Sequence, residues 1–267
     1  MKQLTPIHFA DNYLINPTNP LTVNLIGAGG TGHRLLTELA RMHVSLLALG
    51  HPGLKVNLFD DDKVSEANIG RQMFASTEVG HYKAVVLIER INRFCGTNWK
   101  AVTEKFGTQT LHLLPNKGRA NIYLTCVDTV KARFDIAKAL QKIGANNRME
   151  RDKALYWMDF GNSRFTGQLV LSTLSPIKQP ESERFKPVSH LPLVTDEFKG
   201  LLESVDDKDE PSCSQAEALK KQDLYINTTL ANYGASLLWQ LLQAGMITCR
   251  GVFVNLQNFR TTPLMLA

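Results

Sequence analysis

Residues 21–62 read LTVNLIGAGGTGHRLLTELARMHVSLLALGHPGLKVNLFDDD, and this stretch decides the fold of the chain. Residues 21–26 form a short apolar run that is typical of a strand, and a second run at 55–60 predicts another. The segment between them is predicted to be a helix because its apolar residues recur at helical spacing: Leu35, Leu36, Leu39 and Met42. The order strand, turn, helix, strand is the unit from which parallel α/β sheets are built.

The turn after the first strand is rich in glycine and reads GAGGTG over residues 27–32, which contains the spacing GxGxxG. Glycines allow a tight turn, let backbone N–H groups approach a phosphate, and let the next helix pack closely on the strand. The positive N-terminal end of that helix would face the bound anion. An acid at the end of the second strand can accept ribose hydroxyls. The candidate nucleotide contacts are therefore Gly27, Gly29, Gly30, Gly32 and Asp60.

Length and composition limit the classes of protein to consider. With 267 residues and 43% hydrophobic residues, the chain can bury a sizeable core. We expect an N-terminal arm at residues 1–20 and a single domain at 21–267. The net charge of +5 is mild and no dense Lys/Arg tract with interleaved aromatics is present, so a sequence-reading nucleic-acid domain is not expected. No signal-like N-terminus and no run of about 18 apolar residues is present, so we expect no membrane partner.

The cysteines exclude two other kinds of site. The chain has four, at positions 95, 126, 213 and 249, and none forms a CxxC pair. A tetrathiolate zinc site and a local redox motif are therefore not expected. Widely spaced cysteines are consistent with the reduced cytoplasm. Cys126 lies inside an apolar strand and is expected to be a core residue.

Strands and helices continue to alternate beyond the opening unit. Helices are predicted at 83–94, 129–143 and 214–244, and strands at 101–106, 121–127, 154–160, 166–174 and 251–256. The strand at 166–174 alternates like an antiparallel strand. We therefore predict an α/β fold: a doubly wound, Rossmann-like, mainly parallel sheet with antiparallel strands added toward the C-terminus. The helix at 83–94 is expected to bury Val86, Leu87, Ile91 and Phe94.

The composition changes between about residues 175 and 212. Prolines and charges accumulate there, including the acid-rich run ESVDDKDEP. This pattern predicts a long surface loop, which is either disordered or a mobile cover over the site.

Polar residues after the second strand point to a highly charged nucleotide. The loop that follows Asp60 carries Asn68, Arg71 and Gln72, Lys83 opens the next predicted helix, and Asp128 ends a later strand. In a doubly wound sheet these positions converge on the crevice at the carboxyl edge. Two cations and a strand-end acid suit a triphosphate with Mg²⁺, the acid holding the metal. A dinucleotide has less phosphate charge to neutralise and needs no metal.

Four sequence blocks carry a family resemblance. The blocks GAGGTG, FDDDKVSEANIGRQ, VGHYK and LTCVDTVKAR resemble the ThiF/MoeB and ubiquitin-activating-enzyme superfamily between about Leu21 and Leu171. Further on, PSCSQAEALKKQDLYINTTLANYGASLLWQLL followed by GVFVNL is similar to the ThiF-related component of the PRTRC plasmid cassette.

The resemblance implies roles for individual residues. Gly29 would line the ATP site and Asp60 would bind the ribose, while Asp128 would chelate Mg²⁺. The triphosphate would be surrounded by Asn68, Arg71, Gln72 and Lys83. Asp62 resembles a further acid on the phosphate or metal side. Relatives have Asn at the position of Thr129, so one nucleotide contact is weaker here. Gly167-Gln168 resembles a strand that lies near the bound protein tail in relatives.

The chemistry that the resemblance implies is adenylation. The C-terminal carboxylate of a ubiquitin-like or sulfur-carrier protein attacks the α-phosphorus of ATP, and Mg²⁺, Arg71 and Lys83 stabilise the charge on the phosphates. Relatives work as homodimers, and we expect the same here. The paired CxxC zinc ligands of the family are absent, so no structural zinc is expected. No arginine precedes Arg34, so an arginine finger from the partner subunit's N-terminal arm is missing or comes from elsewhere.

Cys213 is the candidate thioester nucleophile of such an enzyme. It lies in the PSCS turn at the start of the predicted helix 214–244, where a helix N-terminus can depress a thiol pKa. The alternative is an unreactive loop cysteine. Two alternatives also remain for the function as a whole. One is a NAD(P)-dependent Rossmann oxidoreductase, and the other is an adaptor of the same fold that binds nucleotide or a partner without turnover.

Overall fold

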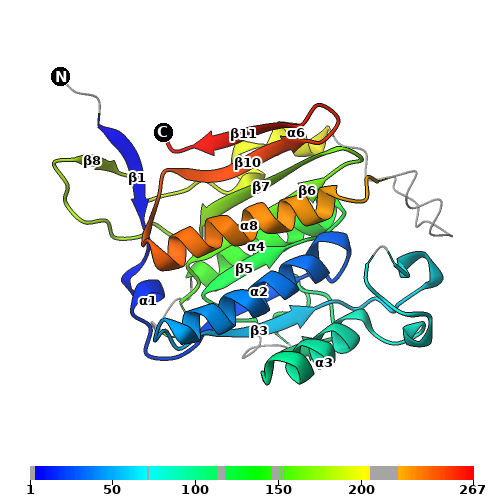
Figure 1. The fold of residues 1–267 in the computed structure, drawn as a ribbon. Helices are drawn as coiled ribbons and strands as arrows, with labels where there is room; N and C mark the ends of the chain where they lie inside the picture. The colour runs from blue at the N-terminus through cyan, green and yellow to red at the C-terminus, as the bar shows by residue number, and fades with distance from the viewer. Residues whose placement is uncertain (1–3, 71, 113–117, 146–150, 152, 205–221) are drawn as a thin grey trace.

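The computed structural model describes residues 4–70, 72–112, 118–145, 151, 153–204 and 222–267. Its centre is an eight-stranded sheet (Figure 1). From one edge to the other, the strands are β11 (Arg260–Met265), β10 (Cys249–Asn255), β7 (Thr166–Thr173), β6 (Tyr156–Asn162), β5 (Ile122–Thr125), β2 (Leu21–Ile26), β3 (Leu54–Phe59) and β4 (Lys100–Val102). The strands from β6 to β4 are parallel, whereas β7, β10 and β11 are antiparallel to their neighbours. The predicted fold class is confirmed.

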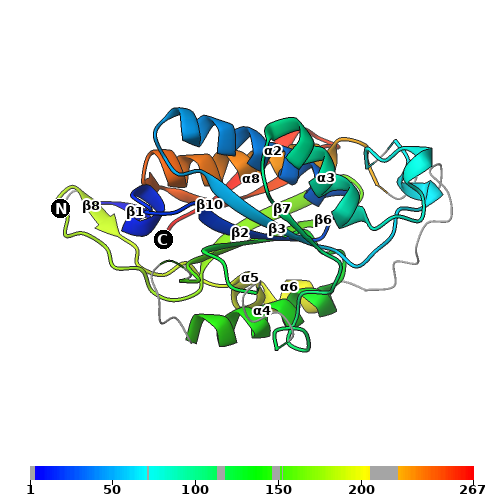
Figure 2. The ribbon, with the colours of Figure 1, turned by 90° about the horizontal axis from the view of Figure 1, so that it is seen from below.

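Helices cover both faces of this sheet (Figure 2). One face carries α2 (Gly30–Ala48), α3 (Lys83–Cys95) and α8 (Ile226–Gln243), and the other carries α4 (Val130–Ala145), α5 (Val194–Glu197) and α6 (Lys199–Glu203). Strands covered on both faces are mostly apolar, and every residue of β5 is buried. The buried residues accordingly form two hydrophobic clusters.

The opening unit folds as its sequence pattern predicts. The strand β2 pairs with β3 in parallel over its full length, from Leu21 opposite Leu54 to Ile26 opposite Phe59. The apolar residues predicted for the inner side of α2 are all buried: Leu35, Leu36, Leu39 and Met42. Because α2 starts directly after the glycine turn, its N-terminus lies at the carboxyl edge of the parallel strands, on the right in Figure 1.

The predicted buried side of α3 is wrong at its last residue. Leu87 is buried, as expected, together with Ala84 and Ile88. Phe94, by contrast, is 89% exposed. Val86, Ile91 and Cys95 are partly buried against the same core, whereas Phe94, next to Cys95 in the last turn, extends into solvent.

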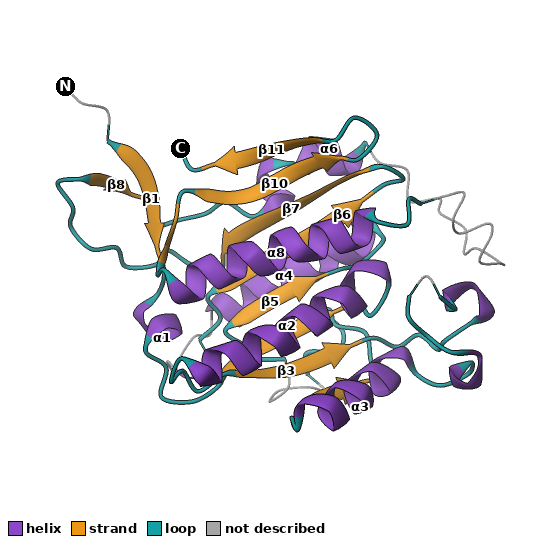
Figure 3. Ribbon diagram, in the orientation of Figure 1, coloured by secondary structure: helices purple, strands orange, loops and turns teal. Residues whose placement is uncertain are grey.

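The first twenty residues contain regular structure. The strand β1 (Thr5–Phe9) pairs in parallel with β8 (Phe185–Pro187) and antiparallel with β9 (Met246–Ile247), which gives a second, three-stranded sheet (Figure 3). A short helix, α1 (Asn12–Ile15), follows β1. The predicted loop at 175–212 thus contains β8, α5 and α6 within its described part, residues 175–204.

The segment at 175–204 is attached to the body of the protein by buried contacts. Leu191 and Val194 are 0% and 2% exposed. Arg250 of β10 forms an ion pair with Glu197 of α5. These described residues pack on the α4 face of the sheet and against β1, not over the carboxyl edge.

Two boundaries near the C-terminus differ from the sequence pattern. The helix α8 begins at Ile226, and residues 214–221 of the predicted helix lie outside the described residues. The strand β11 was not predicted because its sequence, RTTPLM, contains a proline and its residues are mostly exposed at the edge of the sheet. None of the helices in the described part of the chain has both the length and the apolar character that crossing a bilayer requires.

Candidate functional site

The glycine turn after β2 is shaped by close backbone contacts. Gly27 has a φ of 97° and donates its N–H to the carbonyl of Phe59 at 2.8 Å. A Cβ on Gly27 would lie 2.6 Å from the carbonyl oxygen of Cys126, and one on Gly32 would lie 1.8 Å from that of Gly27. A Cβ on Gly29, in contrast, would meet no atom of the described chain within 4 Å. The turn is therefore closed toward the sheet and open at Gly29, where a phosphate could approach the backbone.

Asp60 links the turn to the end of β3. Its Oδ2 accepts the N–H of Ala28 at 2.6 Å, and its Oδ1 accepts the N–H of Asp62 at 3.0 Å. Burial raises the pKa of the Asp60 carboxyl, and the hydrogen bond from Ala28 and the charge of Lys83 oppose this rise. A carboxylate has about four acceptor positions, so two remain for ribose hydroxyls after these contacts.

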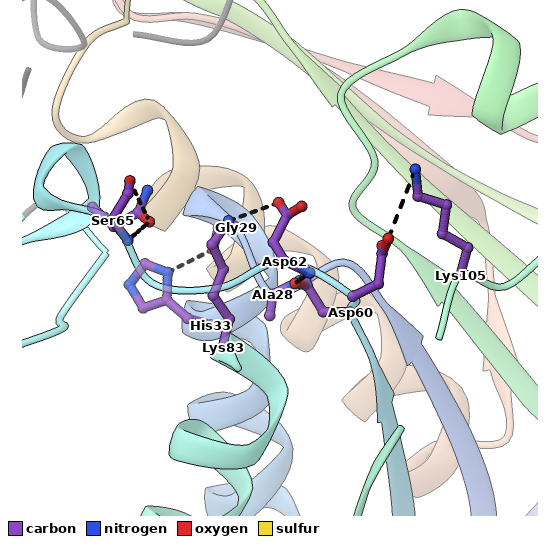
Figure 4. A network of polar contacts seen from close by, with 10 residues as sticks. Ala28, Gly29, His33, Asp60, Asp62, Ser65, Lys83 and Lys105 are labelled. Atoms are coloured by element: carbon purple, nitrogen blue, oxygen red, sulfur yellow. Dashed lines mark hydrogen bonds and ion pairs between the residues drawn. The ribbon is translucent and has the colours of Figure 1, made fainter. Parts of the chain in front are cut away.

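Lys83 stands at the first turn of α3 beside the glycine turn (Figure 4). Its Nζ lies 2.8 Å from Oδ2 of Asp62, and its N–H donates to the carbonyl of Asp62 at 3.0 Å. The side chain of Lys83 is 10% exposed, whereas that of Asp62 is 67% exposed. Asp62, expected as an acid on the phosphate or metal side, is here the counter-ion of Lys83.

The chain between β3 and α3 makes an excursion at residues 62–82 that closes on itself. Lys63 bridges to Tyr82, and the N–H of Val64 donates to the carbonyl of His81 at 2.8 Å. Two short 3₁₀ helices, η1 (Glu66–Asn68) and η2 (Ser76–Glu78), lie within it. The excursion therefore enters α3 close to the point where the chain leaves β3.

Three of the predicted phosphate contacts lie on this excursion. Asn68 is buried, and its Oδ1 accepts the N–H and the hydroxyl of Ser65 at 2.9 and 3.0 Å, which caps η1. Gln72 is 5% exposed, and its Oε1 has no hydrogen-bond partner among the residues that the structure describes. An orphaned buried acceptor is compatible with a ligand that completes it. Arg71 lies outside the described residues.

The predicted metal ligand follows the strand beside β2. Asp128 comes shortly after β5 and is exposed. Thr129, the next residue, accepts the N–H of Ala132 on its hydroxyl at 3.2 Å and so caps α4. The structure therefore brings the end of β5 to the same sheet edge as the glycine turn and Asp60, while Thr129 already has a structural contact. Gly167, of the predicted tail strand, packs closely against Leu230 of α8.

A buried ion pair behind this edge was missed in the sequence. Nε of Arg133 on α4 lies 2.8 Å from Oδ2 of Asp159 on β6, and Thr125 donates its hydroxyl to Oδ1 of Asp159 at 2.7 Å. Nη2 of Arg133 also donates to the carbonyls of Val127 and Phe160, at 3.2 and 3.1 Å. Burial raises the pKa of the Asp159 carboxyl, and Arg133 opposes this rise. Arg133 thus fixes the chain that leads to Asp128. The charged residue within the apolar run ALYWMDF was the available signal.

A second missed contact joins the glycine turn to α8. Thr31 donates its hydroxyl to Oδ1 of Asn227 at 2.8 Å, and Nδ2 of Asn227 donates to Gln222 at 2.8 Å. A Cβ on Gly30 would lie 2.6 Å from the Asn227 side chain. The first turns of α2 and α8 therefore pack together, and Gly30 is required by this approach. Nothing in the sequence pairs two residues so far apart in the chain.

A cysteine and a histidine lie beside the glycine turn. Cys213 lies outside the described residues. Cys126 is half-buried at the end of β5, and burial raises the pKa of its thiol far above the usual range, so this thiol is not an activated nucleophile. His33 is buried and its Nδ1 lies 2.8 Å from the carbonyl oxygen of Gly29. Within the described ranges, no three His, Cys, Asp or Glu side chains lie close enough together to hold a metal ion.

The open α/β sheet and the acid and lysine beside its glycine turn define a Rossmann-like protein with a candidate nucleotide site. A model of the ThiF family matches residues 17–263, and the chain belongs to this family. No curated protein is significantly similar to it in sequence.

Solved structures with the same fold share little sequence with this chain. PaaA matches with a TM-score of 0.61 at 14% identity, over 95% of this chain and 74% of PaaA. Escherichia coli MccB determined with ATP matches with a TM-score of 0.56 at 14% identity, and MccB determined with MccA with 0.59 at 13%. Each of these matches covers 95% of this chain but 66% of MccB, so this chain spans slightly less than two thirds of MccB.

Proposed function

We propose that this protein is an ATP-dependent adenylating enzyme that activates the C-terminal carboxylate of a small ubiquitin-like or sulfur-carrier protein. One observation carries the proposal. The open backbone at Gly29, the carboxylate of Asp60 and the ammonium of Lys83 meet at one edge of the sheet. Membership of the ThiF family supports it, and the likeness to MccB determined with ATP supports ATP as the nucleotide.

In the proposed reaction, a carboxylate oxygen of the partner attacks the α-phosphorus of ATP. The bond between the α-phosphorus and the bridging oxygen breaks, and pyrophosphate leaves with its electrons, so the products are an acyl-adenylate and pyrophosphate. A carboxylate is ionised at neutral pH, so no protein base is needed. The protein contributes position and charge: Lys83, with Arg71, neutralises oxygens of the phosphates.

Asp128 is the residue that we propose as a ligand for Mg²⁺. Proteins usually bind Mg²⁺ through one or two carboxylates together with substrate phosphates, so a single exposed acid fits such an ion. The ion would supply positive charge to the phosphates when bound. Asn68, Gln72 and Thr129 complete the proposed surroundings of the nucleotide, and the orphaned acceptor of Gln72 supports a ligand there. No zinc site is part of the proposal.

The partner that supplies the carboxylate is proposed to be a small polypeptide, which the structure of MccB with MccA supports by analogy. The similarity of the C-terminal segment to the PRTRC component supports placing the chain in that subtype. We also propose a homodimer in the cytoplasm, as the family resemblance implies. Cys213 remains the candidate for a thioester with the activated partner.

The test is ATP–pyrophosphate exchange stimulated by a small ubiquitin-like or sulfur-carrier protein. Wild-type protein should exchange, and Asp128→Ala or Arg71→Ala should abolish exchange. Lys55→Ala is the matched control, because Lys55 is exposed on β3 outside the proposed site. A thermal shift with NAD but none with ATP·Mg²⁺ would favour an oxidoreductase. ATP binding without any exchange would favour an adaptor. Intact mass analysis of the same mixture detects or excludes an adduct on Cys213.

A further inference from the structure

The helix α3 holds the excursion at 62–82 in two places. The first is its N-terminal residue, Lys83, which bonds to Asp62. The second is Arg90, two turns further on. Nη1 of Arg90 donates to the carbonyl of Met73 at 2.8 Å, and Nη2 donates to both carboxylate oxygens of Glu78, at 2.8 and 3.0 Å. A guanidinium that joins a carbonyl and a carboxylate of the same excursion fixes their relative positions.

The backbone at Met73 has an unusual conformation. Its φ is 60°, in the left-handed region that residues with a side chain seldom adopt. The side chain of Met73 is largely exposed, so little burial of its own keeps the residue in place. The two residues on either side of Met73 are buried: Gln72 is 5% and Phe74 is 3% exposed. Arg90 donates its hydrogen bond to the carbonyl of this strained residue, where it can stabilise the left-handed backbone conformation.

Glu78 ties the same guanidinium to η2. Its Oε2 accepts the N–H of Ala75 at 2.8 Å as well as the hydrogen bond from Arg90. Burial alone would raise the pKa of the Glu78 carboxyl, but the bonds from Ala75 and Arg90 outweigh it, and the pKa is lowered. The carboxylate is therefore held in its charged form by the contacts that close the excursion.

We infer that Arg90 is a positioning residue of the nucleotide site, which acts by clasping Met73 and Glu78 so that Gln72 is held toward the phosphates. This inference rests on the proposed function for the identity of the ligand. Arg90 acts through the backbone next to Gln72, because its guanidinium donates to the carbonyl of Met73 and to the carboxylate of Glu78. The clasp residues are Arg90, Met73 and Glu78.

The test combines amide hydrogen exchange with ATP·Mg²⁺ binding in the full chain. In Arg90→Gln, amides of residues 72–79 should exchange about tenfold faster, while amides of β2 stay unchanged. The dissociation constant for ATP·Mg²⁺ should rise about fivefold. Arg93→Gln is the matched control, because Arg93 is an exposed arginine in the last turn of the same helix. It should leave both quantities at their wild-type values.

Glu78→Gln separates the clasp from a simple effect of charge. Removing a negative charge near the site would strengthen binding of an anionic nucleotide if charge alone mattered. The clasp predicts the opposite: faster exchange at 72–79 and binding about threefold weaker. Arg90→Lys, which cannot make the forked contact, should fall between wild type and Arg90→Gln.

Three results would overturn the inference: weaker binding in Arg90→Gln with unchanged exchange at 72–79, no change in either quantity, or stronger binding in Glu78→Gln. A wild-type protein that binds no ATP·Mg²⁺ would refute the proposed function. In that case the exchange comparison of Arg90→Gln with Arg93→Gln still decides whether Arg90 orders the excursion.

Discussion

Two ion pairs near the carboxyl edge of the sheet have the same length, 2.8 Å, and opposite access to water. In the pair of Lys83 and Asp62, the acid is 67% exposed, whereas in the pair of Arg133 and Asp159 the side chains are 6% and 0% exposed. An exposed partner can be exchanged for a phosphate at little cost in desolvation. A buried partner cannot leave without stranding a charge. Two ion pairs of equal length therefore have different expected roles: Lys83 and Asp62 in binding a ligand, Arg133 and Asp159 in stabilising the fold.

The largest expected effect is on the buried pair. Asp159→Ala leaves the guanidinium of Arg133 without its partner and should lower the free energy of unfolding by about 3–5 kcal/mol. Asp62→Ala should change it less than Asp159→Ala does, because the Asp62 carboxylate is 67% exposed and water can take its place beside Lys83. Urea unfolding measures both. Replacing both buried partners, as in Arg133→Met with Asp159→Leu, should restore much of the loss. Equal losses for Asp159→Ala and Asp62→Ala would remove the distinction between the pairs.

The next effect concerns activity. Lys83→Ala should reduce partner-stimulated ATP–pyrophosphate exchange by about 100-fold or more, because the ammonium is proposed to stabilise charge on the phosphates. Its free energy of unfolding should fall by less than that of Asp159→Ala, because the acid left without a partner, Asp62, is exposed to water. Lys55→Ala serves again as the control for the loss of a lysine. Retention of exchange in Lys83→Ala would contradict the assignment of the exposed pair to the ligand.

A smaller effect distinguishes the two possible roles of Asp62. If Asp62 only balances Lys83, Asp62→Asn should bind ATP about threefold more tightly without Mg²⁺, because a negative charge beside the phosphates is lost. The same gain should persist with Mg²⁺ present. If Asp62 instead helps to hold the metal, the variant should bind ATP·Mg²⁺ more weakly than wild type. Calorimetric titrations with and without Mg²⁺ give both values.

The smallest effect is on the pH dependence of stability. Burial raises the pKa of Asp60 above its ordinary value of 3.8. The folded state therefore binds this proton more tightly than the unfolded state. Its contribution to stability is fully present below pH 3.8 and is lost as the pH rises through the folded pKa. Asp60→Asn should remove this decline in stability across that window. The free energy of unfolding is measured from pH 4 to 7 for wild type and Asp60→Asn. Equal slopes for the two proteins would contradict a raised pKa of Asp60.

The fold and the glycine turn could be predicted because both follow from local sequence patterns. The glycine spacing at 27–32, the apolar runs on either side and Asp60 at a strand end all act within one βαβ unit. Parallel strands bring their carboxyl ends together, so the end of the strand before Asp128 could be assigned to the same edge without coordinates. Lys83 could be placed there for the same reason, because it begins the helix after the neighbouring strand.

The rest depends on contacts between distant residues and could not be predicted. The bond of Thr31 to Asn227 joins positions 196 residues apart, and the pair of Arg133 and Asp159 depends on how α4 lies against β6. Phe94 is exposed although its neighbour Cys95 packs against the core. Periodicity identifies a face of a helix, but it does not say which residues at the border of that face meet a neighbouring element.

The bond between Thr31 and Asn227 also limits how this protein can be divided. The glycine motif lies entirely within residues 21–62. A side chain at Gly30 would nevertheless clash with Asn227 of α8, and α2 packs against that helix. A fragment that kept residues 21–62 and lacked α8 would expose the apolar side of α2 and would lose the contacts that α8 makes with the glycine turn. The glycine motif therefore depends on a helix that lies outside its own βαβ unit.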